Sequence, residues 1–134
     1  MADVVIDTDV ASLLQKGRAP AWVHASISGN RVWLTFVTVG ELMKWTVVRS
    51  WGETRRERLD SWIADRPIIP YDRSVADQWG ELAGAAQLRG RPRPQNDTWI
   101  AACCIRQNVP LVTLNTTDFA DFADNDGLIL LGAD

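Results

Sequence analysis

The stretch from Asn96 to Phe119 constrains the fold of this chain most. It reads NDTWIAACCIRQNVPLVTLNTTDF, which predicts a helix with Asp97 in its first turn, a short buried strand over 111–114, and a loop holding Asn115 and Asp118. In an open α/β sheet, helix starts and strand carboxyl ends meet in one crevice, where such sheets bind ligands. Carboxylates gathered there repel one another and resist ionising. We therefore expect a divalent cation at this crevice.

Composition limits the class of protein. The 134 residues fit a single domain over 1–134, and a hydrophobic content of 46% is enough for a core that needs neither disulfides nor structural metals. The net charge of -3 excludes a strongly basic nucleic-acid binder but permits a local basic face. Cys103 and Cys104 are adjacent within a helical pattern, so their side chains diverge and we expect buried thiols.

The first ten residues, MADVVIDTDV, are interrupted by acids and lack a basic head, so we expect no secretory signal. No apolar run approaches the ~20 residues that cross a bilayer. We expect a cytoplasmic protein without a membrane partner.

An acid follows each of the first two predicted strands. Val4 to Ile6 is β-branched and apolar, and Asp7, Thr8 and Asp9 follow it before a helix over 10–15. Either acid alone could be a plain helix cap, but capping does not need both. The run over 32–37 has the near-continuous apolarity of a strand buried in a parallel sheet. A helix then follows from about Thr38 with Glu41 in its first turn, where an acid can also complement the helix dipole.

The middle of the chain is predicted to alternate helices with one short strand. Helices are expected over 18–28, 53–66 and 74–89, with a short strand over 67–70. In the helix that carries Glu41, the side chains of Leu42, Trp45 and Val48 are expected to face inward. His24, the only histidine, has no partner for a zinc site or a catalytic triad. From Phe119, the turn-rich segment FADFADNDG precedes a last apolar run over 128–131.

Two arginine groups could meet a phosphate backbone. Arg55, Arg56 and Arg58 either follow such a backbone or form a solvated helix face paired with nearby acids. The stiff loop GRPRP displays Arg91 and Arg93 just before Asp97, where they could bind substrate phosphates or only aid solubility.

Taken together, the acids predict a magnesium site and phosphodiester hydrolysis. The set is Asp7, Glu41, Asp97 and Asp118. Magnesium prefers oxygen ligands and keeps several waters, whereas zinc is disfavoured without a histidine or thiolate cluster. Such a cation activates water and neutralises charge at phosphorus.

At these residues the chain resembles the PIN-domain ribonucleases, and within them the VapC toxins of bacterial toxin-antitoxin pairs. The segments VVIDTDV, TVGELMKW, QNDTWIAACC and LVTLNTTDF resemble the family's four motifs in order and spacing, and the resemblance covers essentially the whole chain. It implies an α/β three-layer sandwich, a parallel five-stranded sheet with helices on both faces. It also implies endoribonuclease activity that depends on Mg²⁺ or Mn²⁺, and inhibition by an antitoxin that inserts a basic residue into the acidic pocket.

The resemblance also assigns residues. Asp7, Glu41, Asp97 and Asp118 match the family's acidic positions, Asn115 matches the asparagine of T-x-N-x-x-D-F, and Thr8 matches the small residue after the first acid. Asp9 departs from the family, which more often has Asn or Ser there. This extra charge either tightens metal binding or caps the helix.

Three alternatives remain open at this point. A phosphatase of the haloacid dehalogenase type would use Asp7 as nucleophile, and a phosphoacceptor receiver module would use the same acidic pocket, but both resemble families that need a lysine late in the chain. The last lysine here is Lys44. An inactive PIN fold that only binds a partner is the third alternative.

A homodimer is expected from the aromatic content. Seven tryptophans are many for a core of this size, and Trp22, Trp45 and Trp51 are the ones expected at a partner surface, because interface cores are enriched in aromatic residues.

Overall fold

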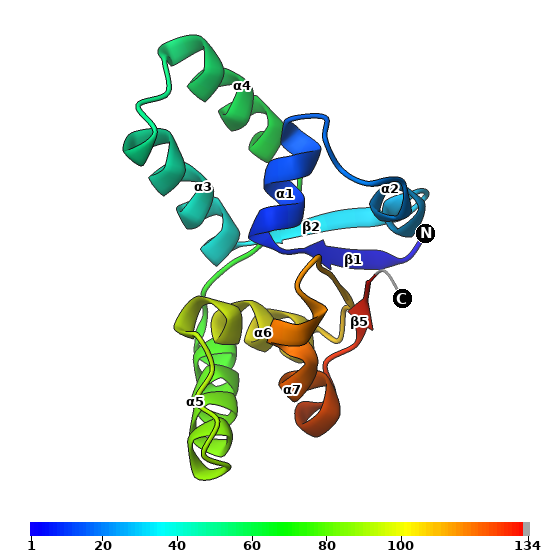
Figure 1. Cartoon of the computed structure of the whole chain (residues 1–134), viewed down its shortest axis with the longest axis vertical. Helices are drawn as coiled ribbons and strands as arrows, with labels where there is room; N and C mark the ends of the chain where they lie inside the picture. Colours follow the sequence, from blue (N-terminus) through cyan, green and yellow to red (C-terminus); the bar gives the residue numbers. More distant parts are fainter. Residues whose placement is uncertain (133–134) are drawn as a thin grey trace.

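A computed structural model describes residues 1–132 as a five-stranded parallel sheet between two layers of helices (Figure 1). The strands are β1 (Asp3–Ile6), β2 (Arg31–Thr35), β3 (Ile68–Ile69), β4 (Leu111–Val112) and β5 (Leu130–Leu131), in the order β3-β2-β1-β4-β5. All four neighbouring pairs are parallel, with Val5 opposite both Trp33 and Leu111. The predicted α/β sandwich is confirmed.

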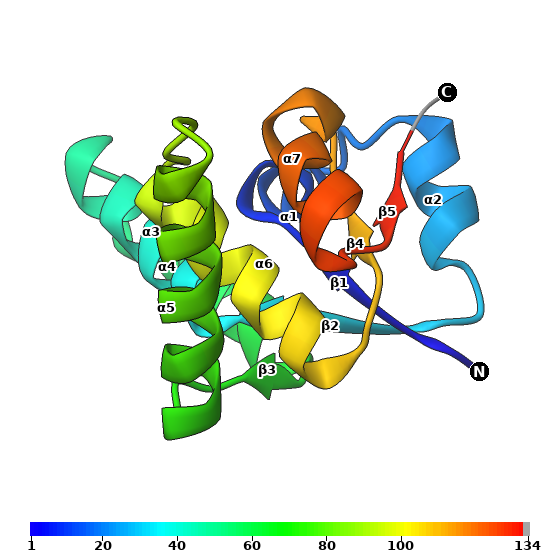
Figure 2. The same ribbon diagram turned by 90° about the horizontal axis from the view of Figure 1, so that it is seen from below.

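The helices divide between the two faces. They are α1 (Thr8–Gln15), α2 (Ala21–Ile27), α3 (Phe36–Val48), α4 (Glu53–Ala64), α5 (Arg73–Leu88), α6 (Gln95–Gln107) and α7 (Thr116–Asp126). In Figure 1, α1 to α4 lie above the sheet and α5 to α7 below it, and Figure 2 shows α5 running beside α6. Because β1 is the central strand, the residues after its carboxyl end face helices from both layers.

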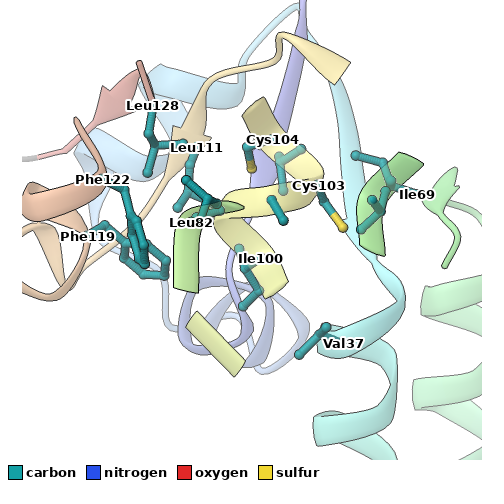
Figure 3. Packing of buried hydrophobic residues seen from close by; sticks show 14 residues of the cluster. Val37, Ile69, Leu82, Ile100, Cys103, Cys104, Leu111, Phe119, Phe122 and Leu128 are labelled. Carbon is teal, nitrogen blue, oxygen red and sulfur yellow. The ribbon is translucent and has the colours of Figure 1, made fainter. Parts of the chain in front are cut away.

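Side chains along β1 point alternately to the two faces of the sheet, and each face has its own hydrophobic core. Val5 points into the cluster beneath α5, α6 and α7, whereas Val4 and Ile6 point into the cluster beneath α1 to α4. Cys103 and Cys104 are free thiols within the first cluster, where Figure 3 shows them between Leu111 and Ile69. Both thiols are buried, as predicted, and burial raises the pKa of the Cys103 thiol to about 12.

Several sequence predictions are wrong in detail. The second strand ends at Thr35 instead of 37, because the Thr35 hydroxyl accepts from the Thr38 amide at 3.2 Å and so caps α3. Val48 was expected to face inward but is 69% exposed, whereas Leu42 is buried as predicted. The segment that starts at Phe119 is not a run of turns: up to Asp126 it belongs to α7, which buries Phe119 and Phe122.

Among residues 1–132, no helix is both long and apolar enough to cross a membrane.

Candidate active site

Asp7 lies where β1 ends and α1 begins. Its Oδ1 accepts from the Val10 amide at 2.9 Å, so it is the N-cap of α1, and its Oδ2 accepts from the Thr113 hydroxyl at 2.6 Å. The side chain is 3% exposed. Asp7 is therefore a cap, as one interpretation of the sequence had it, but its second oxygen is held in addition by a residue 106 positions away.

Glu41 is held by Thr8, the residue after Asp7, at the end of a chain of hydroxyl groups. Thr8 Oγ1 donates to Glu41 Oε1 at 2.6 Å and lies 3.0 Å from Thr38 Oγ1. Because the Thr8 hydroxyl has only one proton, the Thr38 hydroxyl is the donor to Thr8. Since α3 begins at Phe36, Glu41 is in its second turn, and the prediction of the first turn is wrong. This position suits the contact, because it lies one turn beyond Thr38.

Asn115 connects the segments that follow β1 and β4. Its side-chain amide donates to Asp9 Oδ2 at 2.8 Å, and its backbone amide donates to Thr113 Oγ1 at 2.9 Å. Asn115 thus positions Asp9 directly and Asp7 through Thr113. It is also the N-cap residue of α7, although its side chain accepts no capping hydrogen bond.

Asp97 and Asp118 complete the acidic cluster from the opposite helix layer. Asp97 is in the first turn of α6, as predicted, and Asp118 is in the first turn of α7, which corrects its predicted place in a loop. The charges of Asp9, Glu41 and Asp118 act on Asp97, and those of Asp9 and Asp97 act on Asp7. We call these five carboxylates, Asp7, Asp9, Glu41, Asp97 and Asp118, the acidic cleft.

Burial and the crowding of the carboxylates raise the pKa values of Asp7 and Asp97. Burial raises the pKa of Asp7 to about 6, against the hydrogen bonds from Thr113 and Val10, and the charges of Asp9 and Asp97 add to the rise. Burial also raises the pKa of Asp97 to about 6, with further contributions from Asp118 and Glu41. The charge of Arg93 opposes the second shift. The carboxylates from both helix layers therefore act on one another.

The donor chemistry fits a hard cation, although the ligand set is not preassembled. Within residues 1–132, no group of three or more His, Cys, Asp or Glu side chains is already placed to hold a metal ion directly. The ion pairs in the same range involve Arg73 or Arg89, so no basic side chain is paired with the acidic cleft. Carboxylate oxygens with uncompensated charge suit magnesium, which keeps waters between itself and some of its ligands. Zinc chemistry does not fit, because His24 is exposed on α2 and both thiols are in the core.

The basic loop between α5 and α6 flanks the cleft as predicted. Arg93 is close enough to lower the pKa of Asp97 from what burial alone would give, and its Nε is buried without a hydrogen-bond partner in the structure. Arg91 is exposed and acts with Arg93 on Asp121. Arg93 is thus the closer of the two to the acids.

Thr38 and Thr113 are the site residues that sequence reasoning missed. Thr113 is the threonine of the T-x-N-x-x-D-F motif, so a signal for it was present. Thr38 had no such signal, because its contact with Thr8 joins residues 30 positions apart.

The family model for the PIN domain matches residues 4–125 of this chain. The match spans most of the sequence and includes every residue of the acidic cleft. This protein therefore belongs to the PIN-domain family.

The relatives are more specific. The chain is 30% identical over 125 residues to Ribonuclease VapC5 of Mycobacterium tuberculosis, covering 92% of this chain and 87% of the relative. It is 27% identical over 128 residues to Ribonuclease VapC1 of Haemophilus influenzae, covering 90% and 92%. Within the PIN domains, the chain is a member of the VapC group.

Solved structures agree with this placement. VapBC2 from Rickettsia felis, bound to a promoter DNA fragment, superposes with a TM-score of 0.82 at 21% identity and covers 98% of this chain and 99% of its counterpart. VapBC-5 from Mycobacterium tuberculosis gives 0.70 at 26% identity, covering 99% and 100%. The phosphatase and receiver alternatives are set aside, because the PIN family is established by the match over residues 4–125.

Proposed function

We propose that this protein is an endoribonuclease that hydrolyses RNA phosphodiester bonds with Mg²⁺ or Mn²⁺. The observation that carries the proposal is the acidic cleft, in which carboxylates from both helix layers act on one another and no basic side chain of the described range pairs with them. The named activity of the VapC relatives supports the same reaction.

The proposed roles follow from the contacts. Asp7, Glu41, Asp97 and Asp118 would hold the cation, and a bound cation would supply an activated water and charge neutralisation at the phosphate. Thr8 orients Glu41, and Asn115 orients Asp9. Asp9 adds negative charge at the edge of the cleft, where it raises the pKa of both Asp7 and Asp97.

The loop arginines are the proposed phosphate ligands next to the cleft. Arg93 would bind a substrate phosphate through the terminal amino groups of its guanidinium, since its Nε is buried, and Arg91 would bind one further out. Replacing both with alanine is expected to weaken RNA binding and to reduce its dependence on salt. An unchanged salt slope would leave the loop as solubilising surface only.

An antitoxin is the proposed protein partner, and its contact with the cleft follows from charge. The solved neighbours include VapBC complexes, which contain a toxin and an antitoxin. A guanidinium from such a partner, forked to two carboxylates, would neutralise the cleft and exclude the cation. The proposed role is then a cytoplasmic toxin that stops translation by cutting RNA until its antitoxin binds.

We also propose a homodimer, but with an interface at a different surface from the one expected from the sequence. Trp22, Trp45 and Trp51 are half-buried and pack against the second core cluster, which weakens the original reason for placing them at an interface. Val47 and Val48, at the end of α3, are 68% and 69% exposed. They are better candidates for contact with a second copy.

Cleavage of RNA by purified protein tests the reaction. We expect cleavage with Mg²⁺ or Mn²⁺, none with EDTA, and loss of most activity in Asp7→Asn, Glu41→Gln and Asp97→Asn, each of which keeps the side-chain shape. Asp124→Asn is the matched control, because Asp124 is exposed on α7 outside the cleft. Full activity in the Asp7 and Asp97 variants would refute the site. An intact wild-type fold that cuts no RNA with either metal would favour the inactive, partner-binding alternative.

A further inference from the structure

Helix α1 connects the acidic cleft to a group of basic side chains. Asp7 caps its start and Lys16 its end, and eight residues of helix span about 12 Å. A hollow of about 320 Å³ runs along it from Asp9 and Asn115, past Trp45 and Arg49, to Lys16. A second hollow, of about 480 Å³, begins at the same Lys16 and is lined further on by three arginines, Arg18, Arg55 and Arg58. Lys16 lines both hollows, so they adjoin at its side chain, and we call the two together the α1 groove.

The cations of the α1 groove have no acidic partner within the described residues. No ion pair of residues 1–132 includes any of its five cations, which are Lys16, Arg18, Arg49, Arg55 and Arg58. The α4 arginines are exposed, as the interpretation of a solvated helix face predicted, but none of them is ion-paired with an acid of the described residues. Partial burial and the nearby charges of Arg49, Arg55 and Arg18 lower the pKa of Lys16. Cations that crowd one another without an acid are arranged for an external polyanion.

The groove also contains a surface for bases. Trp45 and Leu114 line its first part, between the acids and Lys16. Arg49 lies over the Trp45 ring at 4.9 Å, and Arg55 lies over Trp51 at 3.7 Å, so both guanidinium groups are held in place. Alternating phosphate ligands and aromatic surface is the arrangement that binds single-stranded nucleic acid.

We propose that the α1 groove binds the single-stranded RNA substrate on one side of the cleaved bond, with phosphates at Lys16, Arg49, Arg55 and Arg58 and a base against Trp45. This proposal rests on the proposed function, since the strand ends in the acidic cleft. RNA is favoured over an acidic protein segment because the groove starts at carboxylates, where a phosphate can be bridged by the catalytic cation. It also offers an aromatic face that an acidic segment does not use.

The test measures binding of a short fluorescent oligouridylate by anisotropy over a range of KCl concentrations. All proteins carry Asp97→Asn and are kept in EDTA, so that binding is separated from cleavage. Because single strands release about 0.7 counterion per phosphate contact, Arg55→Gln/Arg58→Gln should lower the salt slope by about 1.4. The matched control is Arg56→Gln/Arg106→Gln, which also removes two exposed charges but lies outside the groove. It should leave the slope unchanged.

A second double variant keeps the test possible if the first one does not fold. If Arg55→Gln/Arg58→Gln does not melt as a folded protein, Lys16→Gln/Arg49→Gln provides the same test from α1 and α3. In addition, Trp45→Leu should weaken oligouridylate binding about fivefold or more with the salt slope unchanged, because a stacked base contributes affinity without counterion release.

Three results would overturn the proposal. The first is an equal salt slope in the groove and control variants, and the second is no binding of oligouridylate by any of the proteins. The third is binding of poly-L-glutamate, but not of oligouridylate, that is lost when the groove cations are replaced. The last result would assign the groove to an acidic protein segment. If the wild type cuts RNA while the slopes are equal, the groove fails and the proposed function stands. If the slope falls but no metal supports cleavage, the proposed function fails and the groove still binds RNA.

Discussion

Replacing Asp7 with asparagine is expected to change how the stability of the metal-free protein depends on pH. The folded-state pKa of about 6 lies about 2 units above the ordinary value of 3.8, and each unit is worth 1.36 kcal/mol, so ionising this 3% exposed carboxyl costs the fold about 3 kcal/mol. The folded state holds this proton more tightly than the unfolded state does. The penalty is therefore absent below about pH 4, develops between pH 4 and 6, and is complete above pH 6.

Asparagine removes the penalty at a cost in hydrogen bonds. Its Oδ1 can still accept from Val10, but its amide meets the Thr113 hydroxyl, which then loses its acceptor, at about 1–3 kcal/mol. The variant should be less stable than the wild type at pH 4 by that amount. At pH 8 it should be equal or more stable, because the removed penalty offsets the loss.

The assay is urea unfolding in EDTA at pH 4, 5, 6 and 8. The difference in unfolding free energy between variant and wild type should shift by about 3 kcal/mol in favour of the variant from pH 4 to pH 8, at unchanged m-value. Asp124→Asn, which replaces an exposed acid, should show no such shift. Parallel stability curves for wild type and Asp7→Asn would refute the electrostatic account of the cleft.

Four further results are expected. Thr8→Val should lower RNA cleavage tenfold or more while keeping the fold, because Glu41 loses its donor; an unchanged rate would mean that the hydroxyl chain does not position Glu41. Thr113→Val should lower the unfolding free energy at pH 8 by about 1–3 kcal/mol, because it leaves an oxygen of Asp7 unpartnered; denaturant unfolding measures this, and no loss would contradict it. Mg²⁺ at ~100 times its dissociation constant should stabilise the wild type by about 2.7 kcal/mol, seen as a higher Tm, and should scarcely affect Asp7→Asn/Asp97→Asn; equal stabilisation would place the metal elsewhere. Sedimentation should give a dimer in the micromolar range that Val47→Ser/Val48→Ser weakens, and a wild-type monomer would refute the dimer.

The sequence predicted the fold class well because its strongest signals are local. Short β-branched runs bounded by acids mark the strands, and α6 carries Asp97 in its first turn as its pattern indicated. The errors arose where one hydrogen bond outweighed the pattern. Apolar residues continue past Thr35, so periodicity could not show that its hydroxyl caps a helix there. In α7, the Asp and Asn content suggested turns, whereas the spacing of Phe119 and Phe122 was the better guide.

The sequence was enough to predict which acids form the candidate site, but not the hydrogen bonds that orient them. Sequence order placed Asp7 and Asp97 near strand ends and helix starts, which is enough to expect crowding. The contacts that orient the carboxylates join residues far apart in the chain, such as Thr113 with Asp7 and Thr8 with Glu41. Such pairings depend on register and helix orientation, which neither composition nor spacing determines.

The acidic cleft and the α1 groove gather like charges of opposite sign at the two ends of α1. Asp9 at its start raises the pKa values of Asp7 and Asp97, while Arg49, Arg55 and Arg18 lower the pKa of Lys16 at its end. Each sign agrees with the helix dipole, so α1 itself tolerates both. The carboxylates and the cations nevertheless repel within their own groups. An RNA strand with a divalent cation relieves both at once, because its phosphates neutralise the groove and the cation neutralises the cleft. Substrate and metal should therefore bind with positive coupling, and an oligouridylate should lower the Mg²⁺ concentration needed to stabilise a cleavage-deficient Glu41→Gln protein.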